Sequence, residues 1–270
     1  MRWFTLLFML PHIFASMLIL ADLEYIEHYR RRLAVTLPLL LLASVALPAL
    51  LGWTAFMVII AIYTIYHLMA QQAGIAAMLA ENRCLWHRLW GGISFVFLTV
   101  IYLLVLVPVP PGSAWIDMVL AGLGAALILS TWQAYSGSRT SIGAGYICAN
   151  SAMLLACLLF YYVQMPFFLI LMPRVVHDIT AFLVYVAHNT NRAVARAPSA
   201  MGLLQRLVPL PVMYLTPLAG IGLTVMVTYL FQSHMMVILP FMALFHYHWE
   251  AVMWRSGSPL RQHLLLSRPA

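Results

Sequence analysis

Charged residues are scarce in this sequence. They make up 8% of its 270 residues, whereas 64% are hydrophobic; a soluble domain carries about 25% charged residues. Lysine is absent, so all 14 basic residues are arginine. This composition cannot supply the polar surface of a water-soluble protein, and it excludes disordered, collagen-like, coiled-coil and nucleic-acid-binding classes. The sequence therefore predicts an all-α, polytopic membrane protein whose main partner is the lipid bilayer.

Familiar sequence motifs are missing as well. The three cysteines form no CxxC pair, which argues against a zinc ribbon or a disulfide framework. There is no P-loop, GxGxxG, GxSxG or HExxH motif, and the clustered histidine boxes of membrane desaturases are absent. Histidine is what stands out, because ten histidines accompany only seven carboxylates.

Apolar runs close to twenty residues long recur along the chain, as helices that cross about 30 Å of hydrocarbon require. We predict nine spans, at residues 3–22, 33–51, 53–79, 89–108, 115–132, 143–163, 166–190, 209–230 and 234–255. They leave no room for a separate soluble domain and show no convincing repeat. Residues 1–270 are therefore predicted to form a single transmembrane domain.

The arginines predict the orientation, because cytoplasmic loops are enriched in basic residues. With the N-terminus outside, twelve of the fourteen arginines fall in four cytoplasmic loops (23–32, 80–88, 133–142 and 191–208) and a cytoplasmic C-terminal tail. These are Arg30, Arg31, Arg32, Arg83, Arg88, Arg139, Arg192, Arg196, Arg206, Arg255, Arg261 and Arg268. The predicted location is the cytoplasmic (inner) membrane of a bacterium.

Polar side chains inside the spans are the candidate functional residues, since ionisable groups are costly at bilayer depth. Four histidines are predicted near the midplane, one from each of four spans: His12, His67, His177 and His246. His188 and Glu250 lie closer to the cytoplasm; Glu250 is at i+4 from His246, and His188 shares a helix face with His177. Gln71, Asp178, Arg174 and Tyr185 are predicted to support these six residues. His28, His87, His234 and His263 are expected to be solvated or interfacial.

Histidines from several helices at one depth favour a metal site, because imidazole is the commonest side-chain ligand for iron, copper and zinc. We predict His12, His67, His177 and His246 as ligands of iron (Fe²⁺), with His188 and Glu250 as further ligands or as donors to a second ion. The alternative for each histidine is a hydrogen bond between helices. For Arg174 and Asp178, spaced i and i+4, the alternative is a buried ion pair.

The order of these residues resembles the bacterial and archaeal β-carotene 15,15'-dioxygenases of the Brp/Blh family. Pro11-His12 is similar to an early Pro-His of that family, and His67 to a histidine near its third span. His177 and His188 followed by Arg192, and His246 followed by Glu250 and Trp254-Arg255, resemble its two later motifs. The chain lacks a glycine after His12 and a proline before His246, which indicates a distant relative. The resemblance implies a polytopic fold, a non-haem iron and cleavage of a carotenoid.

Three functions remain open from the sequence. The first is a histidine-ligated non-haem iron oxygenase that uses dioxygen on a lipophilic substrate such as a carotenoid, an isoprenoid or an acyl chain. A hydroxylase or desaturase of this kind would also need a cytoplasmic electron donor. The second is a redox protein with haem b held by two histidines, and the third is a metal or proton transporter with a histidine–carboxylate relay.

Overall fold

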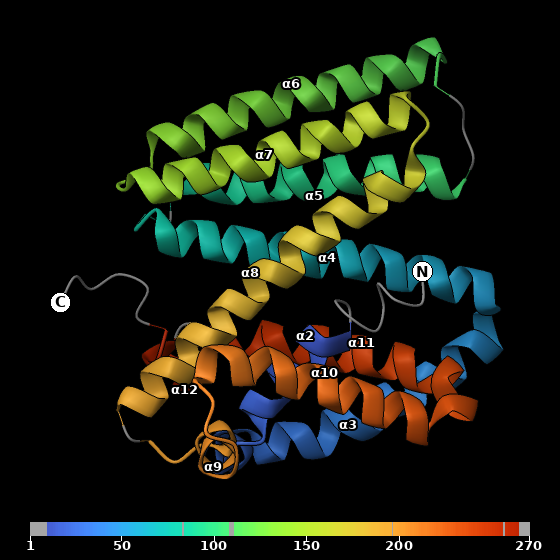
Figure 1. Ribbon diagram of the computed structural model, residues 1–270. Coiled ribbons are helices and arrows are strands. Elements are labelled where there is room, and N and C mark those ends of the chain that lie inside the picture. The colour runs from blue at the N-terminus through green and yellow to red at the C-terminus, as the bar shows by residue number, and fades with distance from the viewer. Residues whose placement is uncertain (1–9, 83, 108–110, 196, 256, 265–270) are drawn as a thin grey trace. The chain divides into compact units, whose positions relative to one another are not determined.

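The computed structural model describes residues 10–82, 84–107, 111–195, 197–255 and 257–264, and within them all regular secondary structure is helical (Figure 1). The main helices are α2 (Leu10–Leu20), α3 (Leu23–Leu51), α4 (Trp53–Leu79), α5 (Leu85–Leu106), α6 (Ala114–Ser136), α7 (Ser141–Tyr162), α8 (Pro166–Val194), α9 (Ala200–Leu207), α10 (Val212–Leu230) and α11 (Met235–Met253). Two shorter helices are η2 (Gln232–His234) and α12 (Pro259–Gln262). The predicted all-α fold is confirmed for these residues.

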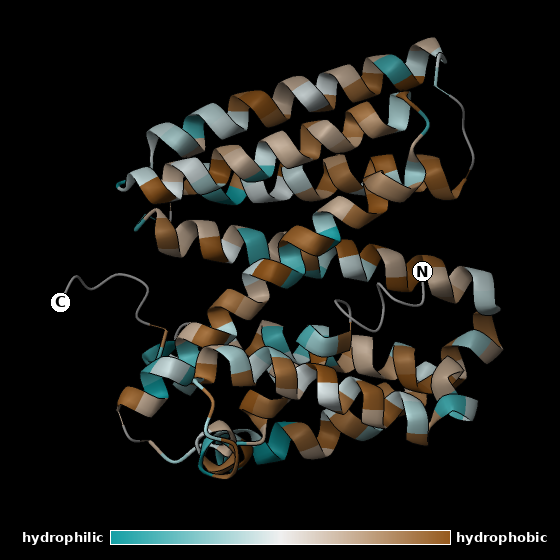
Figure 2. Cartoon of the chain, in the orientation of Figure 1, coloured by the Kyte–Doolittle hydropathy of each residue, from teal (hydrophilic) through white to brown (hydrophobic). Residues whose placement is uncertain are grey.

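Eight of these helices are long and apolar enough to cross a membrane: α3 to α8, α10 and α11. Figure 2 shows the hydrophobic residues that cover much of their length. Eight of the predicted spans correspond to these helices. The ninth, predicted at 3–22, corresponds in part to α2, an apolar helix of 11 residues; residues 1–9 lie outside the described chain. A multi-pass helical membrane protein is thus supported, while the count of nine and the orientation stay predictions.

Two predicted loop segments are helical. The segment 23–32 forms the first turns of α3, with Arg30, Arg31 and Arg32 exposed on it. Glutamate, leucine and arginine are good helix formers, so charge in this segment marks the end of the apolar stretch but not the end of the helix. In the same way α8 continues past residue 190 to Val194, which makes Arg192 a buried helical residue. Of the other predicted loop arginines, Arg83, Arg196 and Arg268 lie outside the described residues.

The chain divides into two compact units, and the boundaries fall within α4 and α8. One unit is continuous and comprises residues 62–177; the other combines residues 1–61 and 178–270. We call them the continuous unit and the split unit. The prediction of a single transmembrane domain stays a prediction.

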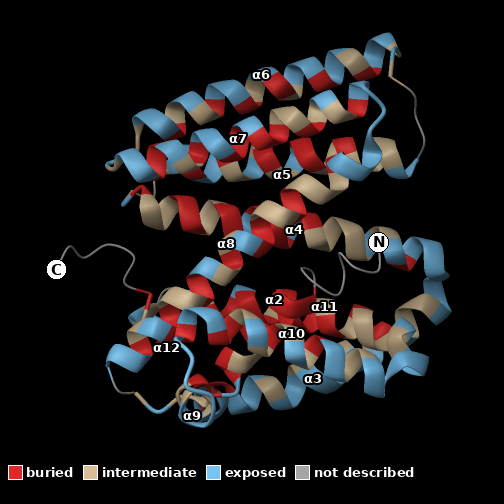
Figure 3. Cartoon of the chain, in the orientation of Figure 1, coloured by how far each residue is buried: buried red, intermediate tan, exposed pale blue. Residues whose placement is uncertain are grey.

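The continuous unit has an apolar core built from α4 to α7 and the start of α8. Trp90, Phe97, Leu120 and Ile147 are among its fully buried side chains. Figure 3 shows buried residues on the mutually facing sides of α5, α6 and α7. The Trp90 indole donates a hydrogen bond to Ser151 Oγ at 2.9 Å, which satisfies its N–H inside this core.

A close approach of α7 to the end of α4 makes Gly143 sensitive to substitution. A Cβ at Gly143 would overlap the backbone of Leu79 and Ala80, whereas a Cβ at Gly145 would meet nothing within 4 Å. We expect Gly143→Ala to lower stability by about 1–3 kcal/mol, because backbone cannot move aside cheaply. Gly145→Ala is the matched control and should be neutral or slightly stabilising. Thermal unfolding of the two variants in detergent checks this; equal midpoints would contradict the close packing.

The split unit is organised around α2. This helix packs against α10 and α11 and also contacts α3 and α9. Its apolar residues Leu10, Ile13 and Phe14 form a buried cluster with Met242 of α11. A Cβ at Gly220 of α10 would overlap the carbonyl of Pro11, so α10 needs a glycine at this point. These contacts fix the depth of His12 on α2 beside His246 on α11.

Candidate metal centre

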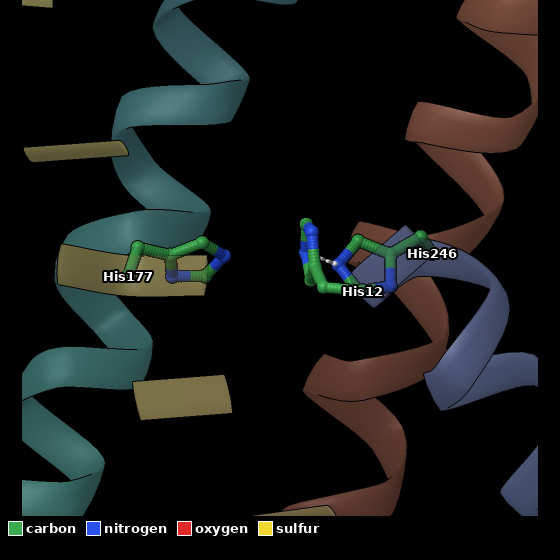
Figure 4. Close-up of side chains that lie close together, drawn as sticks. All are labelled: His12, His177 and His246. Atoms are coloured by element: carbon green, nitrogen blue, oxygen red, sulfur yellow. Dashed lines mark hydrogen bonds between the residues drawn. The ribbon is translucent and has the colours of Figure 1, made fainter. Parts of the chain in front are cut away.

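Two predicted metal ligands of the split unit, His12 and His246, face each other. Their Nε2 atoms are 2.9 Å apart, and the ring centroids are 4.6 Å apart with planes at 82° (Figure 4). Both side chains are fully buried. The two residues come from positions 234 apart in the sequence, so the pair depends on the packing of α2 against α11.

The other ring nitrogen of each histidine has a partner that favours a proton on it. Ser16 Oγ donates to the carbonyl of Ile13 at 2.7 Å, so it has no second proton to give and must accept from Nδ1 of His246 at 2.8 Å. On the other side, Nδ1 of His12 lies 3.1 Å from Oδ1 of Asp178, whose negative charge favours a proton on that nitrogen. In this assignment both Nε2 atoms carry lone pairs.

Two nitrogen lone pairs that face each other at 2.9 Å repel unless a cation lies between or beside them. Two imidazoles that bind one metal ion at about 2.1 Å and at right angles place their nitrogens about 3.0 Å apart. The separation of His12 and His246 matches that arrangement. A single proton shared by the two nitrogens would also relieve the repulsion, so the pair can hold a metal ion or a proton.

A carboxylate lies beside His246 in the split unit. Glu250 lies one turn after His246 on α11, and its Oε2 is 3.9 Å from Nε2 of His246. Its side chain is buried, with 2% exposed. His246 therefore has a histidine on one side and a carboxylate on the other as possible further ligands, with Asp178 and Ser16 behind the two imidazoles.

His188 belongs to a different network of the split unit. Its Nε2 accepts a hydrogen bond from the hydroxyl of Tyr25 at 2.7 Å, and its Nδ1 donates to Asn189 Oδ1 at 3.1 Å. Asn189 in turn donates to Thr216 at 3.1 Å, which orients its oxygen toward His188. Both ring nitrogens thus serve protein hydrogen bonds. This network fits the alternative that the sequence left open, a hydrogen bond between helices, and His188 as a metal ligand stays a prediction.

Arg192 joins that network to the start of α3. Its guanidinium donates to Tyr25 at 3.1 Å and to Glu24 at 2.8 Å, and it lies 3.3 Å from a carboxylate oxygen of Asp22. The backbone N–H of Ala200 also donates to a carboxylate oxygen of Asp22, at 2.6 Å. The buried arginine is thereby neutralised.

The continuous unit contains the other two predicted ligands. His67 of α4 and His177 of α8 have ring centroids 5.0 Å apart with planes at 77°, and both side chains are buried. Gln71 and Arg174, predicted to support the ligands, are buried in the same unit. Tyr185, predicted for the same role, lies in the split unit, where its ring packs against Phe182 at 6.4 Å.

Sequence reasoning missed Ser16 and Tyr25. A lone serine in an apolar span and a tyrosine near the start of a helix resemble many packing residues. One available signal was spacing, because Ser16 is at i+4 from His12 and so lies near it on α2. Tyr25 gave no comparable signal, since its partner His188 is 163 residues away in the sequence.

Comparisons with models of protein families, with curated proteins and with solved structures return no match for this chain. They add nothing to the resemblance to the Brp/Blh family.

Proposed function

We propose that this protein is a membrane-embedded non-haem iron oxygenase whose iron is bound by His12 and His246, with Glu250 beside His246 as a further ligand. The observation that carries the proposal is the pair of Nε2 atoms at 2.9 Å, and both atoms carry lone pairs when Asp178 and Ser16 hold the protons on the two Nδ1 atoms. Two histidines and one carboxylate with open positions are typical of iron(II) enzymes that use dioxygen. When bound, the iron would supply the activation of dioxygen.

The supporting residues also suit a metal centre. A metal-binding histidine commonly gives its second nitrogen to a carboxylate or another acceptor, which fixes the ring and raises its basicity. Asp178 lies 3.1 Å from the second nitrogen of His12, and Ser16 accepts from that of His246. We also predict that His67 and His177 belong to the same centre, because they lie midway along their predicted spans. The variants His67→Ala and His177→Ala test this prediction.

The location of the pair points to a substrate that dissolves in lipid. His246 and Glu250 lie on a helix long and apolar enough to span a membrane, and both are buried. We therefore propose a carotenoid, an isoprenoid or an acyl chain as the substrate class. The proposal also keeps nine spans, with the N-terminus outside, in a bacterial cytoplasmic membrane.

The same geometry argues against haem held between these two histidines. Axial ligands on opposite sides of one iron have nitrogens about 4 Å apart, with the porphyrin plane between them. The separation of 2.9 Å fits neighbouring positions on a metal instead.

A proton-conducting transporter is the second candidate. It is favoured by the contact of Asp178 with His12, of His12 with His246, and of His246 with Ser16. A proton shared by the two imidazoles would be one step of such a relay. Metal content separates the two candidates.

The deciding experiment is elemental analysis with an absorption spectrum, on detergent-purified protein from cells grown with iron. We expect one iron per chain, or two if His67 and His177 hold a second ion, and no Soret band. Folded protein without bound metal would overturn the iron proposal and favour the relay. The metal contents of His67→Ala and His177→Ala then show whether these residues belong to the centre.

Asp178→Asn should weaken iron binding by about 10- to 100-fold, the usual cost of removing the partner of a ligating histidine. The amide keeps the shape of the side chain but loses the charge that favours the proton on Nδ1 of His12. A titration of apo-protein with Fe²⁺ under nitrogen measures the change. Asp117→Asn, on α6 of the continuous unit, is the control. Equal iron affinities of the two variants would exclude the proposed role of Asp178.

A further inference from the structure

A cysteine and a histidine outside the candidate metal centre lie close together at the start of α5. The thiol of Cys84 is 3.0 Å from Nδ1 of His87. The sequence suggested a solvated or interfacial His87; the residue is not solvated, because only 3% of it is exposed. A cysteine and a histidine within hydrogen-bond distance can act as a nucleophile and its base.

Neither helix capping by Cys84 nor another hydrogen bond of His87 explains this pair. Cys84 is the N-cap residue of α5, yet its side chain makes no capping hydrogen bond and is directed to His87 instead. His87 Nε2 is buried and has no hydrogen-bond partner among the described residues, so the ring is not held there by another polar group. The Cys84 thiol is therefore the polar group that contacts the buried His87 ring.

The surrounding backbone fixes the thiol in place. Asn82 Nδ2 donates to the carbonyl of Gly137 at 2.6 Å, which joins the α4–α5 connection to the end of α6. A Cβ at Gly137 would lie 3.3 Å from the Cys84 sulfur, so the glycine leaves room for it. Cys84 itself is partly exposed, which leaves a path for a reagent.

We propose that Cys84 is a nucleophilic thiol, activated by His87, that accepts an acyl group from a long-chain acyl thioester. The side chains that follow it are apolar and exposed: Leu85 to 63%, Trp86 to 42% and Leu89 to 41%. They lie at one end of a helix long enough to span a membrane. An acyl chain can lie along this surface while its thioester reaches the thiol at the edge of the span, where cysteines are typical acylation sites.

The proposed reaction is a thioester exchange. His87 Nδ1 accepts the thiol proton while the Cys84 sulfur attacks the thioester carbonyl carbon. A new sulfur–carbon bond forms, the bond from that carbon to the donor's sulfur breaks, and the leaving thiolate takes the proton from His87. The products are S-acyl-Cys84 and a free thiol, so no oxidant or reductant is needed.

The chain contains its own comparison cysteines. Cys148 of α7 is exposed, and Cys157 is buried, with its thiol 3.7 Å from the carbonyl of Leu169. Both lie on a helix that is long and apolar enough to span a membrane, so their thiols are shielded from water there. The effect of His87→Gln on Cys84 therefore separates activation by His87 from mere access to water.

The test uses full-length protein in lipid nanodiscs, with palmitoyl-CoA as the probe and peptide mass spectrometry as the readout. We expect acylation of Cys84 at least about 10-fold faster than that of Cys148, and release of the acyl group by hydroxylamine. His87→Gln should slow the Cys84 reaction by about 100-fold, the lower end of a general base's contribution. The rate at Cys148 in the same molecules should not change, which controls for folding.

Equal acylation of Cys84 and Cys148, or an unchanged rate at Cys84 in His87→Gln, would overturn the proposal. Iodoacetamide, a small electrophile, serves as a second probe. Preferential alkylation of Cys84 without acylation by palmitoyl-CoA would likewise refute an acyl donor. No measurement here uses the metal, so the result is independent of the proposed iron function.

Discussion

His246→Ala is expected to lose essentially all stoichiometric iron. The substitution removes one of two facing Nε2 ligands and leaves His12 and Glu250, which come from different helices, without the nitrogen between them. Loss of a direct ligand should exceed the roughly 10- to 100-fold effect of losing a supporting residue. Iron per chain, measured after gel filtration of the folded variant, should fall from one ion to less than about a tenth of an ion. His12→Ala should give the same result.

His248→Ala is the matched control for that experiment. His248 lies on the same helix two residues after His246, so its side chain leaves α11 in another direction. It should retain iron at the level of the unaltered protein. Retention of iron by His246→Ala and His12→Ala would remove both residues from the ligand set, whatever the total metal content.

Gly220→Ala is expected to disturb the centre without changing any ligand. The added methyl group would overlap the Pro11 carbonyl and approach its carbon to 3.1 Å, and Pro11 immediately precedes His12. The helix must shift, and we expect a loss of stability of about 1–3 kcal/mol. Because the ligand nitrogens must remain within a few tenths of an ångström of their positions, iron affinity should fall as well.

Gly222→Ala separates this effect from a general effect of alanine on α10. A Cβ at Gly222 would meet nothing within 4 Å, and the residue is exposed on the same helix. It should unfold at or slightly above the temperature of the unaltered protein and retain iron. Thermal unfolding and iron content of both variants are the measurements. Identical behaviour of the two would contradict the contact of α10 with α2.

Span positions were predictable because they depend on local composition. Apolar length alone placed α4 at its observed bounds, 53–79, and placed most other long helices within a few residues. Charge was a poor guide to helix ends. The segment with Arg30, Arg31 and Arg32 continues α3, because a helix can leave the apolar region without losing its backbone hydrogen bonds.

The residue types of the candidate centre were predictable from the sequence, whereas the hydrogen-bond partners of these residues were less so. His12, His246 and Glu250 were selected from depth and from the i, i+4 spacing, and the structure places both His12 and Glu250 beside His246. The grouping of His188 with His177 came from periodicity along one helix. Periodicity gives the face of a residue but not what packs against that face, so the hydrogen bonds of His188 with Tyr25 and Asn189 could not be derived.

The division of the chain implies an order of assembly during synthesis. Residues 62–177 form a unit from consecutive sequence, whereas the split unit needs both ends of the chain. At about 5–20 residues per second, the 234 residues between His12 and His246 take roughly 10–50 s to translate. Throughout that interval His12 has been synthesised without its counterpart. We expect the split unit to assemble last, so the nascent protein can bind an ion only after α11 has been translated. Ribosome-bound chains arrested before α11 should therefore contain no iron at His12.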